Sequence, residues 1–316
     1  MSAPRLGIVG ARRRRQGLGP FVARDLRAAG ADVTCFVTTS EASRDEAASA
    51  LQAIAGVAAR GYTDLATLLS RESVDALAIL SPSDTHGAAL DAALAAGVHV
   101  LCEKPLVWGE PDLAQRARDI TGAFERAGKL LWENCQWCYT LPAFERLHPG
   151  ALRAPPRRFE MTLQPASAGL QSLADSMPHP LSLLQVLAPG AARLLDVRFE
   201  TGEAGALTIR FVHRTQAHAV DTVVHLRPTR RQPRQASLVL DGLRAERLIS
   251  GPGYRFHFAD GERSVELPDP MTLLVADFVS ALRAGAPPEP ARAHLIAQRM
   301  QLLADLSAAH RTEAAA

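Results

Sequence analysis

The sequence predicts two domains, a doubly wound α/β domain over residues 1–134 and an α+β domain with a mostly antiparallel open sheet over residues 135–316. Length is one indication, because 316 residues exceed what a single hydrophobic core usually serves. Short β-rich runs also alternate with helical patterns in the first half, as in parallel sheets covered by helices on both faces. Beyond about Pro142 strand patterns follow one another with few helices between them, which is typical of antiparallel sheets.

The first domain is expected to alternate strands with helices along its whole length. Pro20 favours the start of its first helix, and Gly30 and Gly97 favour helix ends. The predicted strands are residues 6–9, 32–38, 76–80, 99–102 and 130–134. The predicted helices are residues 20–29, 41–55, 64–71, 85–96 and 110–127.

The second domain is expected to be built mainly from alternating strands. Turn pairs such as Asp241-Gly242 and Asp260-Gly261 separate runs in which apolar and polar residues alternate. The predicted strands are residues 158–163, 195–200, 206–212, 219–226, 236–241 and 254–258. One helix is predicted over residues 172–187, and two closing helices over residues 270–284 and 291–309.

Composition indicates an ordinary globular protein of the cytoplasm. The hydrophobic share is 47%, the charged share is 22% and the formal net charge is +2, so nothing global favours a nucleic acid or an anionic membrane as partner. No apolar run is long enough to cross a bilayer, and residues 1–5 lead into a strand without a signal-peptide core. Four scattered cysteines fit a reducing compartment, and the pair Cys135 and Cys138 lacks the further ligands that zinc needs, so no metal is expected.

The placement of one lysine is the best indication of function. The chain contains two lysines, Lys104 and Lys129, and otherwise uses arginine, which does not release a proton near neutral pH. Lys104 follows the predicted strand 99–102 and therefore stands at the carboxyl edge of the parallel sheet. A lysine at that edge suits proton transfer, although on composition alone a chance placement explains it equally well.

The loop after the first strand is a candidate for binding a dinucleotide pyrophosphate. Such a loop opens a helix, and its free backbone donors and the helix dipole face the anion, as in Rossmann domains. A G-x-G-x-x-G pattern counted from Gly10 would need glycine at positions 12 and 15, where arginine stands, and Gly17 and Gly19 follow. The arginines are either phosphate ligands, which their position favours, or a solvated basic loop. The candidate contacts here are Gly10, Ala11, Arg12 and Arg13.

The end of the second strand favours NADP over NAD. An acidic residue usually stands there when the adenosine ribose carries no phosphate. This chain has Thr38, Thr39 and Ser40, with Arg44 close behind, and hydroxyls with arginine suit a 2′-phosphate. The alternative is an ordinary strand end followed by a helix that Ser40 caps.

Several motifs together resemble the Gfo/Idh/MocA oxidoreductases over nearly the whole chain. They are Gly7-Ile8-Val9-Gly10, the loop from Ser81 to His86, the run from Ala96 to Leu106 with Glu103-Lys104-Pro105, and the closing helices. The resemblance implies that Ser81, Pro82 and His86 lie along the cofactor. It also implies that Glu103 and Lys104 line its nicotinamide end, with a cis Lys104–Pro105 bond.

The same family carries an aspartate and a histidine one helical turn apart near the nicotinamide. Asp175 and His179 have this spacing, which puts both side chains on one helical face. With Lys104 they would supply a general acid/base and a proton relay, in which Lys104 is the principal proton donor or acceptor. The alternative is a helix-start aspartate and a histidine satisfied within the core.

The substrate pocket is expected to depart from the usual pattern. Met177 stands where the family usually has glycine, which makes a sugar or polyol substrate less expected. The segment over residues 132–139 usually contacts substrate in similar proteins, and Trp137 and Tyr139 would form either a flat wall for a ring or part of the core. The candidate substrate contacts are Asn134, Gln136, Trp137, Tyr139 and Met177.

The sequence therefore predicts an NAD(P)-dependent oxidoreductase that transfers hydride between a carbonyl and an alcohol of a small substrate, with NADP favoured and NAD as the alternative. An imine reductase is a second reading. A cofactor-sensing or scaffold protein without chemistry is a third, which the incomplete glycine pattern supports. Similar proteins also imply a homodimer or homotetramer formed through the C-terminal sheet.

Overall fold

The computed structural model describes residues 2–12, 17–251, 255–261 and 263–315, and it divides into two compact units. The first unit comprises Met1–Asn134 and Met271–Ala297, and the second comprises Cys135–Pro270 and Gln298–Ala316. The sequence analysis had assigned all of residues 135–316 to one domain. Residues 271–297 group with the first unit because Phe278 packs edge-on against Trp132, with ring centroids 5.7 Å apart, and the Arg292 guanidinium lies 3.7 Å from the Trp132 ring.

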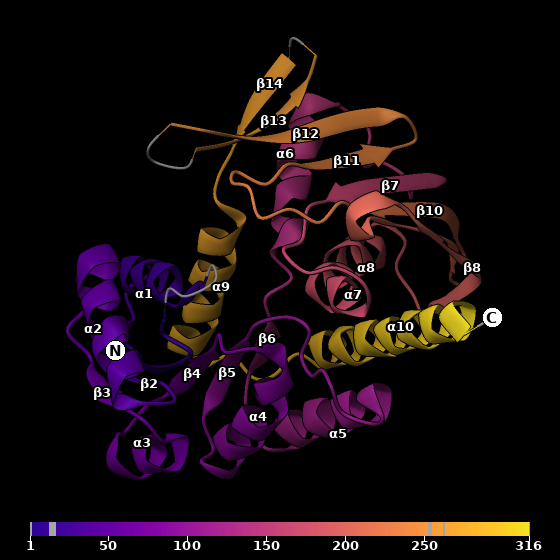
Figure 1. Cartoon of the computed structure of the whole chain (residues 1–316). Coiled ribbons are helices and arrows are strands. Elements are labelled where there is room, and N and C mark those ends of the chain that lie inside the picture. Colours follow the sequence, from indigo (N-terminus) through magenta and orange to yellow (C-terminus); the bar gives the residue numbers. More distant parts are fainter. Residues whose placement is uncertain (1, 13–16, 252–254, 262, 316) are drawn as a thin grey trace. The chain divides into compact units, whose positions relative to one another are not determined.

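The first unit contains the predicted doubly wound parallel sheet. Its described strands run in the order β3-β2-β1-β4-β5-β6, and every neighbouring pair is parallel. This order is that of a Rossmann domain, in which helices cover both faces of the sheet (Figure 1). The strands are β1 (Arg5–Val9), β2 (Asp32–Val37), β3 (Arg60–Tyr62), β4 (Ala76–Ile79), β5 (His99–Cys102) and β6 (Leu131–Glu133).

Local side chains explain where the helices of the first unit begin and end. Ser40 and Ser43 form a reciprocal capping box at the start of α2, and Gly56 closes this helix in the left-handed conformation. Asp64 caps α3 by accepting a hydrogen bond of 2.7 Å from the Thr67 N–H. The helices are α1 (Gly19–Ala28), α2 (Glu41–Ala55), α3 (Leu65–Arg71), α4 (His86–Ala95), α5 (Leu113–Arg126) and α9 (Pro270–Ala284), with the 3₁₀ turn η2 (Ser83–Thr85).

The second unit contains the predicted mostly antiparallel sheet. The described strands run in the order β14-β13-β12-β11-β7-β10-β9-β8, and β7 with β10 is the parallel pair among them. Along β7 buried and more exposed residues alternate, so one face of the sheet is covered. The strands are β7 (Arg158–Leu163), β8 (Arg193–Thr201), β9 (Leu207–Arg214), β10 (Ala219–Leu226), β11 (Ala236–Leu240), β12 (Leu243–Ser250), β13 (Arg255–Asp260) and β14 (Arg263–Leu267).

The helix predicted over residues 172–187 is in fact two helices. Pro178 and Pro180 have no N–H with which to continue the helical hydrogen-bond ladder, so the helix is interrupted at Met177. Met177 itself keeps right-handed helical angles, φ −63° and ψ −27°. The helical elements of this part of the chain are η3 (Gln136–Thr140), α6 (Leu141–Leu147), α7 (Leu170–Ser176), α8 (Pro178–Leu187), η4 (Glu203–Gly205) and α10 (Pro290–Ala315), whose first residues belong to the first unit.

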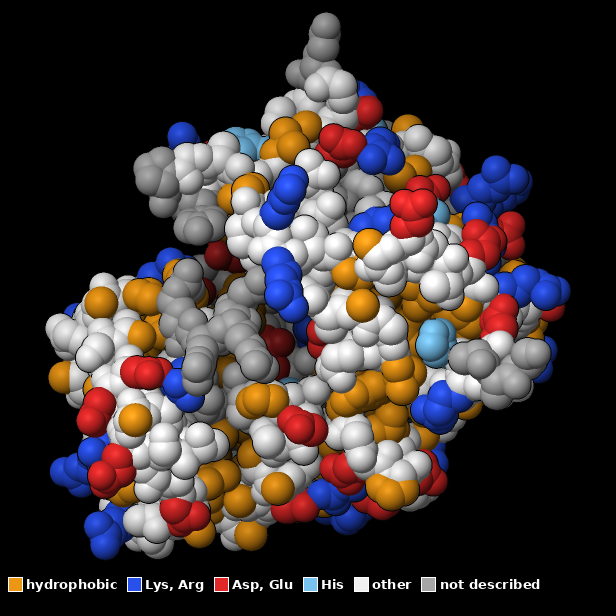
Figure 2. Space-filling model, in the orientation of Figure 1, with side chains coloured by type: hydrophobic (Ala, Val, Ile, Leu, Met, Phe, Trp, Pro, Cys, Tyr) orange, Lys and Arg blue, Asp and Glu red, His pale blue; other side chains and the backbone are white. Residues whose placement is uncertain are grey.

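The surface carries charges of both signs. Figure 2 shows blue and red side chains interspersed over the visible face, in keeping with a formal net charge of +2. Among the described residues, no helix combines the length and the apolar character needed to cross a membrane.

His213 of β9 is a buried titratable group in the second unit. Its side chain is 0% exposed, and neither ring nitrogen has a hydrogen-bond partner in the described parts of the chain. Burial lowers the pKa of His213 to about 4, because the apolar surroundings disfavour the imidazolium. The folded protein therefore holds this ring neutral, whereas the unfolded chain protonates it near its ordinary value.

We predict that stability falls with acidification through this residue. Between about pH 6.5 and about pH 4 the unfolded chain binds the extra proton, so His213 removes on the order of 3 kcal/mol of unfolding free energy as the pH falls through that window. Urea unfolding of the wild type and of His213→Leu between pH 7 and pH 4 measures this. The difference in unfolding free energy between the wild type and His213→Leu should change by that amount from pH 7 to pH 4. A difference that stays constant with pH would contradict the prediction.

Candidate active site

The loop between β1 and α1 is closed by two glycines. Gly10 has φ +88°, and a Cβ atom there would lie 2.6 Å from the backbone nitrogen of Ser81. A Cβ atom on Gly19 would lie 2.7 Å from the Cα atom of Ala11. The described ends of the loop, at Ala11 and Gly19, thus lie against each other, and neither glycine has room for a side chain. The sequence analysis gave Gly19 no such part, because it stands nine residues after Gly10 rather than within the usual spacing.

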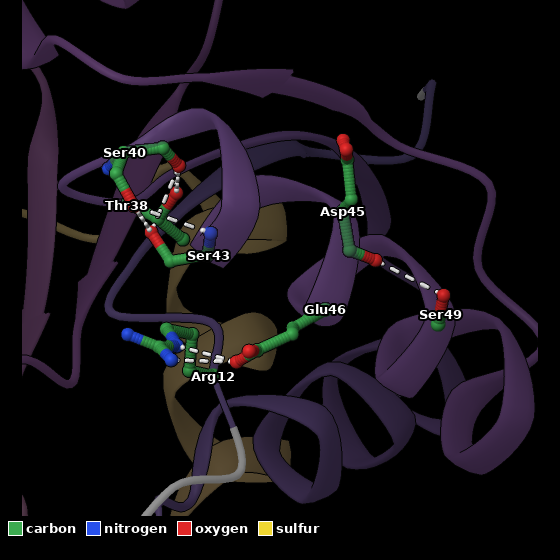
Figure 3. A network of polar contacts seen from close by, with 7 residues as sticks. All are labelled: Arg12, Thr38, Ser40, Ser43, Asp45, Glu46 and Ser49. Atoms are coloured by element: carbon green, nitrogen blue, oxygen red, sulfur yellow. Dashed lines mark hydrogen bonds and ion pairs between the residues drawn. The ribbon is translucent and has the colours of Figure 1, made fainter.

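Arg12 is held by a carboxylate of α2. Its Nε atom donates to the Glu46 carboxylate at 3.1 Å, and its Nη2 atom donates to the same oxygen (Figure 3). A phosphate bound at Arg12 would therefore have to share the guanidinium with Glu46. Arg13, the other candidate in this loop, lies outside the described residues.

The residues after β2 mainly serve the start of α2. Thr38 is buried and donates from its backbone N–H to the Tyr62 carbonyl at 3.0 Å, and its hydroxyl donates to the Ser40 carbonyl. Ser40 caps α2 through Ser43 (Figure 3), while Thr39 is exposed. The prediction that Ser40 caps the following helix is thus confirmed. A 2′-phosphate could still bind here, because Thr39 is exposed to solvent.

Arg44 belongs to an open hollow beside β3. Its Nε atom donates to Asp45 at 3.2 Å, and its Nη1 atom lies 3.6 Å from the Glu41 carboxylate. The hollow is lined further by Arg60, Gly61, Tyr62, Thr63, Asp64, Thr67 and Arg71. It therefore offers three guanidinium groups at the edge of the sheet.

His86 ties the loop after β4 to the segment after β5. Its Nδ1 atom lies 2.9 Å from the Pro105 carbonyl oxygen, and its Nε2 atom lies 2.9 Å from the Ser81 carbonyl oxygen. The residue is 1% exposed. Both ring nitrogens are engaged by the backbone, so His86 holds the shape of the site. In the same loop Ser81 and Thr85 hydroxyls are hydrogen-bonded at 2.7 Å, and Pro82 precedes η2.

The segment around Lys104 begins at the carboxyl end of a parallel strand, as predicted. β5 ends at Cys102 and pairs in parallel with β4, and the Lys104–Pro105 bond is cis, as the family resemblance implied. The Asn134 amide donates to the Glu103 carboxylate, whose pKa burial raises while the charge of Lys104 opposes this. The Leu106 N–H donates at 2.9 Å to Glu133, a buried carboxylate that the sequence analysis did not single out.

Asp175 and His179 lie in the second unit on either side of the break at Met177. The Asp175 carboxylate accepts hydrogen bonds from the Ser167 hydroxyl and from the Gln171 amide, the latter at 3.0 Å. His179 lies against Trp137, with ring centroids 6.4 Å apart. Asp175 lies in the last turn of α7 and His179 in the first turn of α8, so the two residues stand on consecutive helices and not on the single helix expected.

The aromatic candidates differ in exposure. Trp137 is buried and contacts Phe258, with ring centroids 6.5 Å apart, and the Arg247 guanidinium lies 5.2 Å from its ring centre. These contacts favour a packing role for Trp137 in the core of the unit over a role as a wall for a ring-shaped substrate. Tyr139 is partly exposed, and Met177 is fully buried at the junction of α7 and α8.

Two amide oxygens among the candidates remain without a partner. Asn134 Oδ1 and Gln136 Oε1 are shielded from solvent and accept no hydrogen bond from the described residues. Buried acceptors of this kind are costly unless a ligand or water satisfies them. In the described ranges, no cluster of three His, Cys, Asp or Glu side chains is arranged to hold a metal ion.

Comparison with known proteins identifies the first half of the chain. A family model described as "Oxidoreductase family, NAD-binding Rossmann fold" matches residues 5–135. The match to the Gfo/Idh/MocA model covers the part of the chain that contains the parallel sheet. Part of the chain is 34% identical over 99 residues to a D-apiose dehydrogenase from Paraburkholderia graminis and 38% identical over 92 residues to an inositol 2-dehydrogenase from Streptomyces avermitilis. These alignments cover 30% and 29% of this chain, and the chain spans only 25% of the length of each relative.

Solved structures share the fold of this chain from end to end. A myo-inositol 2-dehydrogenase from Lactobacillus plantarum matches with a TM-score of 0.72 at 14% identity, covering 99% of this chain and 98% of that one. A 3-ketoreductase from Actinomadura kijaniata in complex with NADP matches with a TM-score of 0.70 at 18% identity, covering 97% of each chain. At such identities the likeness establishes the fold.

We predict that the protein does not tolerate a side chain at Gly10. Gly10→Ala should lose about 2–4 kcal/mol of unfolding free energy, because the new methyl group meets the Ser81 backbone and the residue is strained at positive φ. Gly128→Ala is the matched control, since Gly128 has φ +66° but nothing within 4 Å of its Cβ position, and it should lose only about 1 kcal/mol. Urea unfolding measures both, and equal losses would contradict a close approach at Gly10.

Proposed function

We propose that the protein is an NADP-dependent oxidoreductase acting on a carbonyl/alcohol pair of a small substrate. The observation that carries the proposal is Lys104, an amine placed just beyond a parallel strand in a segment that His86 and Glu133 hold by backbone hydrogen bonds. Ligands of doubly wound sheets bind at this edge, outside the carboxyl ends of the strands. The relatives named above are dehydrogenases, which supports the same class of reaction.

The residues around the β1 loop fit a bound dinucleotide. Gly10 lets the start of the loop approach the Ser81 backbone closely, and the loop leads into the N-terminus of α1, where backbone donors attract phosphate. When bound, a nicotinamide dinucleotide supplies or accepts the hydride. Gly10 and Ala11 would hold its pyrophosphate through the backbone. Arg12 would also bind the pyrophosphate, sharing its guanidinium between the phosphate and Glu46.

Side chains of the protein would donate or accept the proton that accompanies hydride transfer. Lys104 would give a proton to the carbonyl oxygen in reduction or take it from the hydroxyl in oxidation. His179 would assist this transfer, and Asp175 would orient the neighbouring groups and balance their charge. The unpartnered oxygens of Asn134 and Gln136 would accept hydrogen bonds from substrate hydroxyls. Glu103, bound by Asn134, would set the position of that amide.

We predict that Lys104→Ala lowers kcat by about 100- to 10,000-fold, the usual contribution of a positioned general acid or base. The dissociation constant of NADP should change little, because the backbone holds the cofactor. Lys129→Ala is the matched control, as it removes the other lysine of the chain, and it should leave kcat unchanged. Steady-state kinetics with a screen of polyols, sugars and cyclic ketones, together with cofactor fluorescence titration, measure both quantities.

A Lys104→Ala variant with full turnover would refute the role of the amine. Cofactor binding by the wild type without turnover over the whole screen would favour a sensor instead, and would overturn the proposed oxidoreductase activity.

We predict that the protein binds NADP more tightly than NAD and that Arg44 carries much of the difference. A guanidinium bound to a 2′-phosphate forms charge-assisted hydrogen bonds, so Arg44→Ala should weaken NADP binding by about tenfold or more and leave NAD binding unchanged. Arg118→Ala removes an exposed guanidinium from α5 and serves as control. Dissociation constants from calorimetry decide this, and a wild-type preference for NAD would contradict it.

A further inference from the structure

Two arginines of the second unit have guanidinium nitrogen atoms that are shielded from solvent and lack partners. The Nε and Nη2 atoms of Arg234 and the Nε atom of Arg247 are shielded from solvent and find no hydrogen-bond partner among the described residues. Neither side chain forms an ion pair within those residues, whereas Arg12, Arg44, Arg210, Arg244 and other arginines do. Each buried donor left without an acceptor costs free energy, so an acceptor from outside the chain is indicated.

The two arginines are neighbours and are held in place. Arg247 Nη2 donates to the Arg234 backbone carbonyl at 3.0 Å, and the Arg247 guanidinium lies over the Trp137 ring. In the sheet Arg247 stands opposite Ala236 on β11 and Phe258 on β13, and Phe258 also contacts Trp137. Arg247 therefore belongs to the covered face of the sheet. Arg244 and Glu246 pair with each other on the exposed face of the same strand.

The carboxylates of Asp175 and Asp269 oppose, but do not outweigh, the effect of burial on the two arginines. Burial lowers the pKa of Arg247 to about 10, against the opposing influence of Asp269, and the nearby charge of Arg234 lowers it further. Burial also lowers the pKa of Arg234, with Asp175 opposing. Both groups remain cationic at neutral pH. Two like charges brought this close are stabilised by an anion placed between or beside them.

The arginine pair also adjoins the proposed catalytic residues of its own unit. Trp137 contacts both Arg247 and His179, and the charge of Asp175 acts on Arg234. A ligand group held by the pair would thus lie beside Asp175 and His179. A guanidinium fork matches the oxygens of a carboxylate or a phosphate, which explains the use of arginine at both positions.

We propose that Arg234 and Arg247 form an oxyanion-binding subsite, so that the substrate is an anionic compound, a sugar acid or a phosphorylated sugar, and not a neutral polyol. The inference rests on the proposed function in one respect, that the bound oxyanion is part of the molecule that reacts. The shared chemistry is a carboxylate or phosphate group attached close to the carbonyl or hydroxyl that is reduced or oxidised.

The first test is calorimetry on the full chain saturated with NADP, which keeps phosphate away from the cofactor site. The probes are inorganic phosphate, D-glucuronate and D-glucose 6-phosphate, with D-glucose as the neutral counterpart at constant ionic strength. We expect at least one oxyanion to bind at least tenfold more tightly than glucose. Tighter binding of glucuronate assigns a carboxylate, and tighter binding of glucose 6-phosphate assigns a phosphate. Binding of none of the three, or of glucose equally well, would overturn the inference.

The second test uses variants. Arg247→Met and Arg234→Met keep the length of the side chain and remove its charge, and each should weaken oxyanion binding by about 10- to 100-fold. Arg244→Met removes a guanidinium from the opposite face of β12 and should leave the affinity unchanged. Arg234 precedes β11, so its variant provides the answer if Arg247→Met does not fold. Affinities within twofold of the wild type in the folded variants would assign both arginines to structure alone.

These outcomes separate the subsite from the proposed activity. Oxyanion binding that depends on Arg247 but is followed by no turnover would support the subsite and refute the oxidoreductase. Turnover of neutral alcohols without any oxyanion affinity would support the oxidoreductase activity and refute the subsite.

Discussion

The proposed chemistry depends on a few buried hydrogen bonds that fix the backbone on both sides of Lys104. Asn134 binds the Glu103 carboxylate before it, His86 binds the Pro105 carbonyl after it, and Glu133 accepts the N–H of Leu106. This stretch lies beyond the strand and has no ladder of its own, so side chains must satisfy its backbone groups. His86 also binds the Ser81 carbonyl, and the Ser81 backbone in turn excludes any side chain at Gly10. One connected set of contacts therefore relates the lysine to the loop that follows β1.

Much of the fold could be predicted because it follows from local sequence patterns. The parallel strands of the first unit, the mostly antiparallel sheet of the second and the place of Lys104 at a strand end all follow from periodicity and turn residues. Strand β12 was missed because Arg247 stands on its covered face while Leu243 and Leu248 are exposed, which breaks the alternation of apolar and polar residues. The break at Met177 was missed because the apolar pattern continues through Pro178. Local pattern therefore predicts elements better than it predicts where they are interrupted.

The site was predictable in part, since burial and pairing depend on distant residues. The sequence favoured Arg12 as an anion ligand and did not indicate Arg247, yet Arg12 is paired with Glu46, while Arg247 lies over Trp137 with an unsatisfied Nε atom. His86 was placed near the cofactor by resemblance, but its link between Ser81 and Pro105 arises only when two loops meet. The contrast between paired and unpaired cations, which only the folded chain reveals, separates arginines that hold the structure from those that await a ligand.

The packing of α9 against β6 also bears on how the protein is made. Trp132 is covered by Phe278 and Arg292, which come from the far end of the chain. A ribosome therefore has to deliver nearly the entire polypeptide before the first unit can close over this tryptophan. Until then the side chain of Trp132 lacks the two residues that cover it in the folded chain.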